Sequence, residues 1–260
     1  MAIRSKSRTF SYAFVVLLAF ALSGLAVGTS EVGSAAEADE ETTIAKSLAA
    51  MVNAALAVIS KHQDHIDNAT IGNKGLDGKT VLAQAQQAFQ EATGADPLKI
   101  DPNSRHGRLL GIEMNAIVEI MEANQKSINQ SGIGFKGFIP STFGRLIIER
   151  FSKGAEGDAE IKITAPPELV RNRKSRPDAW ETSIIREKLL SASWPKGQIY
   201  AAAAESKGRP AFRTLVPMYY SASCLRCHGS PKGENDVTGY PKEGASEGNL
   251  GGIISITLFR

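Results

Sequence analysis

The chain has 260 residues, with 30 lysines and arginines, 27 aspartates and glutamates, a formal net charge of +3 and 42% hydrophobic residues. This is the composition of an ordinary globular protein, and it excludes a largely disordered, collagen-like or multi-span membrane protein. The near balance of charges gives no reason to expect a nucleic acid as partner. Two cysteines are too few for a disulfide framework.

The N-terminus has the pattern of a secretory signal. Three basic residues among the first eight are followed by an uncharged apolar run over 12–27 and then by small residues. Such a run fits a signal peptide and is short for a membrane span. We expect residues 1–38 to be a signal peptide, cleaved after Ala36 or Ala38. The protein is then exported to the periplasm and has no membrane span after cleavage. The alternative is an uncleaved N-terminal membrane anchor.

Helical periodicity dominates the chain up to residue 130. Apolar residues recur at three- and four-residue steps over 42–66, 81–92 and 105–127, which predicts three helices. Gly94 is a candidate C-terminal cap of the second helix. Residues 39–130 are therefore predicted to form an N-terminal helical region.

Residues 131–260 have the pattern of a small sheet with helices. Glycines and prolines become frequent, and several short segments alternate between apolar and polar residues as strands do. Helices early and strands late predict an α+β fold with an antiparallel sheet. The expected elements are helices over 141–153 and 179–191, and strands over 159–164, 198–203, 212–219 and 252–259.

One segment, Cys224-Leu225-Arg226-Cys227-His228, carries recognisable chemistry. It has the C-x-x-C-H pattern that attaches haem c, and a chance arrangement of these residue types gives it only about once in ten thousand. Two thiols at this spacing can add to the two vinyl groups on one porphyrin edge, and the next imidazole can then bind the iron. We therefore predict one covalent haem c on Cys224 and Cys227, with His228 as the proximal iron ligand.

Other interpretations of the same cysteines remain open. An exported thiol–disulfide oxidoreductase also carries C-x-x-C, although there the pair normally opens a helix early in a βαβ unit. A disulfide across three residues closes only a tiny loop. A zinc site needs four ligands, and the other histidines are distant in sequence. We retain the oxidoreductase as the alternative function. The sequence shows no acid–base constellation that names a catalytic reaction, so we do not expect an enzyme.

Further motifs accompany the cysteines. They are Phe-Lys-Gly-Phe-Ile-Pro at 135–140, Pro-Asp-Ala-Trp-Glu at 177–181, Thr-Gly-Tyr-Pro-Lys-Glu-Gly at 238–244 and Gly-Ile-Ile-Ser-Ile at 252–256. Together with the C-x-x-C-H segment, they resemble a PAS-like domain family that binds a single c-type haem and is widespread in bacterial sensors. The resemblance implies a PAS-like antiparallel sheet with flanking helices around the haem. Members often carry another cysteine on the N-terminal helix as a sixth ligand, which this chain lacks.

Several other residues are candidates for contacts with the haem. Met218, shortly before Cys224, is a candidate sixth ligand, and ordinary core packing is the competing interpretation. Arg213 is the best single candidate for pairing with a haem propionate, because it lies on the strand that leads to the cysteines. A basic loop is more often a solvated surface, and lone histidines are more often surface or capping residues. These weaker candidates are His62, His65, His106, Arg171, Arg173, Lys174 and Arg176.

The resemblance also implies a function in redox or gas sensing or in electron transfer. Because the chain ends after the last expected strand, we expect a separate redox or signalling protein as partner. A small gaseous ligand is expected only if the sixth position of the iron is open.

Overall fold

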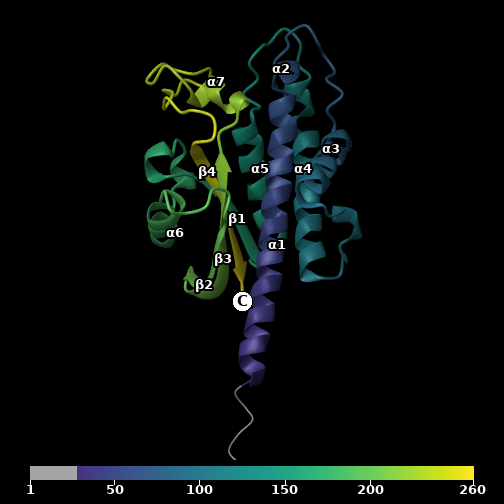
Figure 1. The fold of residues 1–260 in the computed structure, drawn as a ribbon. Coiled ribbons are helices and arrows are strands. Elements are labelled where there is room, and N and C mark those ends of the chain that lie inside the picture. Colours follow the sequence, from purple (N-terminus) through teal and green to yellow (C-terminus); the bar gives the residue numbers. More distant parts are fainter. Residues whose placement is uncertain (1–27) are drawn as a thin grey trace, which may run out of the picture.

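The computed structural model describes residues 28–260 of the chain, with side chains from residue 35 on. Helices surround one antiparallel sheet of four strands in the order β1-β4-β3-β2 (Figure 1). This confirms the predicted α+β class. The strands are β1 (Ala159–Thr164), β2 (Tyr200–Ser206), β3 (Arg209–Tyr219) and β4 (Leu250–Phe259).

The described helices are longest in the first half of the chain. They are α1 (Gly28–Lys61), α2 (Gln63–Ile66), α3 (Gly78–Thr93), α4 (Arg105–Ile128), α5 (Pro140–Gly154), α6 (Ala179–Ile184), which continues as a π-helical turn (Ile185–Leu189), and α7 (Leu225–His228).

The N-terminal helix α1 begins earlier than residue 42, where its apolar stripe led us to expect it. The predicted hydrophobic region of the signal, residues 12–27, lies outside the described residues. Ala38, at a predicted cleavage position, is the first described side chain that packs against the main core. By length and composition, Ala35–Lys61 passes for a membrane span, which is compatible with a signal or an anchor. However, 61% of its most apolar window is buried inside the fold, as in a core helix.

Local capping explains the bounds of α3, which follows its predicted stripe. The Asp77 side chain accepts a hydrogen bond from the backbone N–H of Thr80 at the N-terminus. At the other end Gly94 has φ of 74° and donates its N–H to the Gln90 carbonyl, which confirms the predicted glycine cap. The helix predicted over 105–127 is also confirmed as α4.

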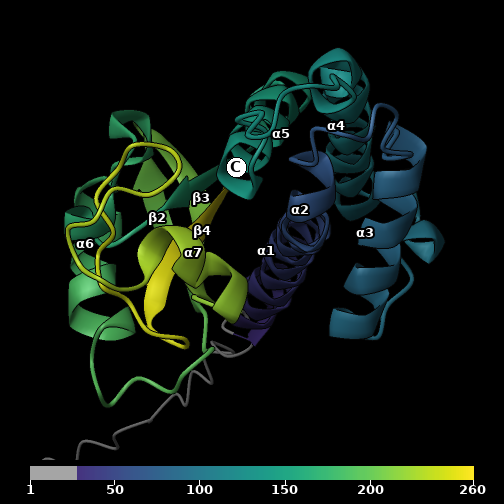
Figure 2. The ribbon, with the colours of Figure 1, turned by 90° about the horizontal axis from the view of Figure 1, so that it is seen from above.

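Successive side chains of the strands point to opposite faces of the sheet, and a separate core lies on each face. Ile254, Ile256 and Leu258 of β4 join the main core on the face covered by α1 and α5, with α3 and α4 outside them, as Figure 2 shows. Ile253 joins a smaller core with Leu215 on the face covered by α6. The main core takes residues from both 39–130 and 131–260. The division into these two regions stays a prediction.

The β2–β3 hairpin sets the register that leads to the site. Lys207 and Gly208 both have positive φ, 54° and 74°, as a two-residue hairpin turn with the twist of its strands requires. Pairing runs from Tyr200–Leu215 to Ser206–Arg209. The turn chemistry therefore extends β2 to Ser206, beyond the strand predicted over 198–203. β3 then runs the full length of the sheet, and the cysteine segment follows directly after its end.

Candidate functional site

The C-x-x-C-H segment lies in the connection between the two central strands β3 and β4. Cys224 ends a 3-10 turn (Ala222–Cys224), while Cys227 and His228 belong to α7. Both thiols are free and partly buried. Because residues three apart share one side of a helical turn, the local fold is suited to presenting both thiols together.

The imidazole of His228 is fixed by two neighbours. Its Nδ1 lies 2.9 Å from Oε2 of Glu243 and 3.3 Å from the hydroxyl of Tyr220. The Tyr220 ring stacks on the imidazole with centroids 4.8 Å apart and an interplanar angle of 26°. Burial together with the nearby Glu243 raises the pKa of Tyr220 to about 12, so this phenol stays neutral.

The contact with Glu243 determines which nitrogen of His228 carries the proton. Burial raises the pKa of Glu243, but hydrogen bonds from Arg171 and His228 outweigh it and the net pKa is lowered. An ionised carboxylate can only accept, so Nδ1 of the neutral imidazole must be the donor. Nε2 then keeps the lone pair that a metal ion needs.

Arg171 joins three segments of the site. Its Nε donates to Oε1 of Glu243 at 2.7 Å, Nη1 donates to Oδ2 of Asp236 at 2.6 Å, and Nη2 donates to the carbonyl of Cys227 at 2.9 Å. The planar guanidinium is the side chain that can satisfy several acceptors in fixed directions at once. Arg171 therefore holds both the carboxylate beside His228 and the backbone of the cysteine helix.

Asp236 is the buried anchor of this network. Besides Arg171, its carboxylate accepts hydrogen bonds from the backbone N–H and the hydroxyl of Thr238 and from the backbone N–H of Tyr240. Burial alone raises the pKa of Asp236, but these donors lower it to about 2. The loop that carries Glu243 is thus built around a carboxylate that is charged at neutral pH.

The environment of Cys227 differs from that of a reactive thiol. Burial and the nearby charge of Asp236 raise the pKa of its thiol above the ordinary value. Thiols that attack disulfides are instead found where neighbouring positive charges or helix ends lower the pKa. Cys227 is therefore protonated at neutral pH.

The cysteine segment rests on the C-terminal end of α1 and on α2. The hydroxyl of Ser60 donates to that of Ser223 at 3.0 Å, directly before Cys224. Nη1 of Arg226 lies 2.7 Å from Oδ1 of Asp64 in an exposed ion pair. These contacts join the segment to the helical layer across a long separation in sequence.

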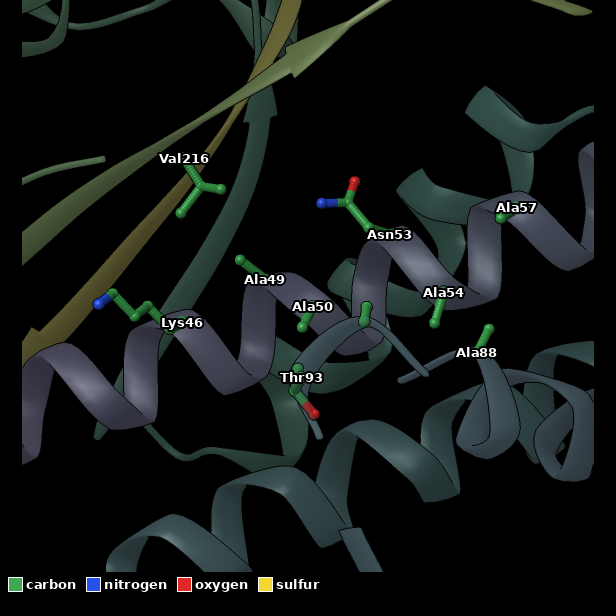
Figure 3. A pocket seen from close by; sticks show the side chains of 10 residues that line it. Lys46, Ala49, Ala50, Asn53, Ala54, Ala57, Ala88, Thr93 and Val216 are labelled. Carbon is green, nitrogen blue, oxygen red and sulfur yellow. The ribbon is translucent and has the colours of Figure 1, made fainter. Parts of the chain in front are cut away.

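A cavity of about 370 Å³ lies farther along the same helix (Figure 3). Asn53 and Ala57 line it. Ala57 follows Asn53 by four residues and precedes Ser60 by three, so all three residues share one face of α1. The described lining contains no residue of the C-x-x-C-H segment. It consists of Lys46, Ala49, Ala50, Asn53, Ala54 and Ala57 of α1, Ala88, Ala92 and Thr93 of α3, and Val216 of β3.

Arg213 lies away from the His228 cluster. Its Nη2 donates to Oδ2 of Asp178 at 2.6 Å, and its guanidinium lies 4.3 Å from the centre of the Trp180 ring, on the α6 side of the sheet. The six residue steps from Arg213 to Tyr219 span roughly 20 Å of strand. The structure thus does not bring Arg213 to the cysteines, and its cofactor-binding role stays a prediction.

The candidate sixth ligands make contacts with other groups. Met218 lies near the end of β3, partly buried against the main core, and its role as a ligand stays a prediction. Nε2 of His62 lies 2.8 Å from Oε1 of Gln84 on α3, and Nε2 of His65 lies 2.9 Å from the Lys74 carbonyl. Each of these two histidines therefore has a neighbour of its own, and both belong to the α1–α2 segment on which the cysteine segment rests.

Comparison with known proteins assigns the chain to a family. A family model described as Tll0287-like matches residues 35–258, which include both the helical layer and the C-x-x-C-H segment. The chain belongs to the Tll0287-like family. Members of this family contain a cytochrome-like, haem-associated domain. No curated protein and no solved structure matches the chain.

Proposed function

We propose that this member of the Tll0287-like family is an exported protein that carries one covalent haem c on Cys224 and Cys227, with His228 as proximal ligand. One observation carries the proposal: Nδ1 of His228 lies 2.9 Å from the Glu243 carboxylate, which leaves Nε2 for the metal, beside two free thiols at the attachment spacing. Metal-binding histidines characteristically have their second nitrogen held in this way. The donor set therefore fits the cofactor.

The haem, when bound, supplies one-electron exchange and, at an open sixth position, a site for a small gaseous ligand. The chain's own residues hold the attachment segment against α1 and orient His228. The strand order, with α6 following β1 and covering one face, supports a PAS-like description. The protein acts in redox or gas sensing or in electron transfer, and passes its signal or electron to a separate redox or signalling protein.

The face of α1 that lines the cavity supports the same proposal. This face is rich in alanine, and it continues to Ser60, which contacts the residue before Cys224. A porphyrin needs a broad apolar surface beside its attachment point, and small side chains provide one without displacing the helix.

A haem stain on a denaturing gel, together with a pyridine haemochrome spectrum, tests the proposal directly. The protein is exported by cells that mature c-type cytochromes, and we expect one stained band with one haem per chain. An unstained band with two thiols overturns the proposal and favours the thiol–disulfide oxidoreductase. His228→Ala should change the spin state, and an unchanged spectrum removes His228 as axial ligand.

Carbon monoxide separates the two roles of a haem protein. Binding to the reduced protein shows an exchangeable sixth position and favours sensing. A six-coordinate iron that does not bind carbon monoxide favours an electron carrier.

A further inference from the structure

Glu243 stands between a fixed cation and the proximal histidine. Both of its carboxylate oxygens are within hydrogen-bond distance of the Arg171 guanidinium, at 2.7 and 3.0 Å, and Oε2 also faces Nδ1 of His228 at 2.9 Å. Its side chain is only 17% exposed. Such a carboxylate has little freedom to turn away from the imidazole, because Arg171 is itself held by Asp236 and the Cys227 carbonyl.

The other neighbours of the imidazole cannot replace this contact. Tyr220 stays neutral and its hydroxyl is farther from Nδ1, at 3.3 Å. Asp236 is turned toward Arg171, Thr238 and Tyr240. Glu234, on the same loop, pairs with Lys242 at 2.8 Å. Among the described carboxylates, Glu243 is thus the one that contacts His228.

We propose that Glu243, clamped by Arg171, is a positioning residue that fixes the orientation of His228 and lowers the reduction potential of the haem. The inference rests on the proposed function, because it needs a haem bound through His228. A carboxylate that accepts the Nδ1 proton makes the imidazole a stronger electron donor through Nε2. Stronger donation stabilises the ferric over the ferrous iron, and the negative charge nearby acts in the same direction.

The test is a redox titration of the purified holoprotein followed by its absorption spectrum. Glu243→Gln keeps the size and an oxygen acceptor but removes the charge. We expect about a tenfold rise in the ratio of reduced to oxidised haem at a given applied potential, which is about 59 mV for one electron. Glu234→Gln removes a charge from the same loop without touching His228, and should leave the ratio within about twofold of wild type.

The outcomes separate this inference from the proposed function. Wild-type protein without covalent haem overturns the proposed function and the inference together. Stained protein in which Glu243→Gln and Glu234→Gln titrate alike overturns the inference and leaves the haem in place.

If Glu243→Gln does not mature, nuclear magnetic resonance of the reduced wild-type holoprotein, with carbon monoxide added where it binds, decides the question. The haem ring current identifies the proximal histidine. We expect its Nδ1 proton to exchange with water at least tenfold more slowly than in a histidine peptide. Exchange at the peptide rate overturns the inference.

Discussion

Nη1 of Arg171 donates a 2.6 Å hydrogen bond to Oδ2 of Asp236, a carboxylate whose side chain is fully buried. The same guanidinium reaches Glu243 and the carbonyl of Cys227. Removing one partner of a buried pair leaves an uncompensated charge, which costs more than the pair itself contributes. The Asp236–Glu243 loop and the cysteine helix therefore depend on one side chain.

Arg171→Ala should lower the free energy of unfolding by about 3 kcal/mol, because it leaves Asp236 without its cation. Urea denaturation measures the change. Arg173→Ala is the matched control, since Arg173 is exposed in the same basic loop, and its effect should stay within about 0.5 kcal/mol. Equal effects of the two substitutions would contradict the assigned role of Arg171.

The lowered pKa of Asp236 predicts acid sensitivity. Its folded value is about 2, against an ordinary value of 3.8, so the carboxylate stabilises the fold above pH 4 and this contribution is lost as the pH falls towards 2. The loss is roughly 2 kcal/mol. Unfolding measured between pH 6 and pH 2 should show it, and Asp236→Asn should flatten that part of the curve. An unchanged slope in the variant argues against the assignment.

Replacement of the buried Glu113 on α4 should stabilise the fold. It is 1% exposed, and neither carboxylate oxygen has a hydrogen-bond partner among the described groups. Burial raises its pKa well above the ordinary value, so it destabilises the fold increasingly as the pH rises above about 4. Glu113→Met should raise the free energy of unfolding at pH 7 by about 1 kcal/mol, and by less at pH 4. Glu91→Met, at an exposed site on α3, is the control and should change little.

Cys224→Ala combined with Cys227→Ala should abolish covalent haem while export continues. Each thioether bond needs its own cysteine sulfur, so the double variant has none, and alanine leaves the rest of the segment unchanged. Haem staining and immunodetection of the exported fraction provide the measurement. Haem that survives denaturation in the double variant would falsify the attachment assignment.

Ala57→Trp should reduce haem loading without unfolding the chain. Ala57 is exposed, lines the cavity and lies between Asn53 and Ser60 on one face of α1, so an indole there fills the space that we assign to the porphyrin. We expect at least a threefold drop in haem per chain, read from the haemochrome spectrum. Ala203→Trp, exposed on β2, should load normally. Equal loading of both variants removes this face of α1 from the haem site.

Much of the fold could be predicted because local rules decide it. The stripes over 81–92 and 105–127 and the cap at Gly94 correspond to α3 and α4. The start of α1 could not be predicted from its stripe, because residues 28–41 are mostly small and acidic. Alanine and glutamate favour a helix by backbone propensity and leave no apolar pattern to read.

The site was predictable only where one short segment encodes it. Cys224, Cys227 and His228 are adjacent, so their spacing alone indicates a chemistry. Glu243 and Asp236 were missed as partners of the histidine and of Arg171, because only the folded loop brings them together. Glu243 lies within the 238–244 motif, which was the available signal. Arg171 could not be told apart from its basic neighbours, which the fold leaves exposed.

β4 is the last strand in the sequence, and it lies between β1 and β3. Neither β1 nor β3 can pair with β4 until β4 itself has emerged, so the sheet closes late through non-local pairing. The cysteines and His228 precede β4 and therefore leave the ribosome while the sheet is still incomplete. A chain cut before Leu250 keeps every attachment residue but exposes two unpaired strand edges. Such a fragment would be a template for aggregation instead of a smaller version of the protein.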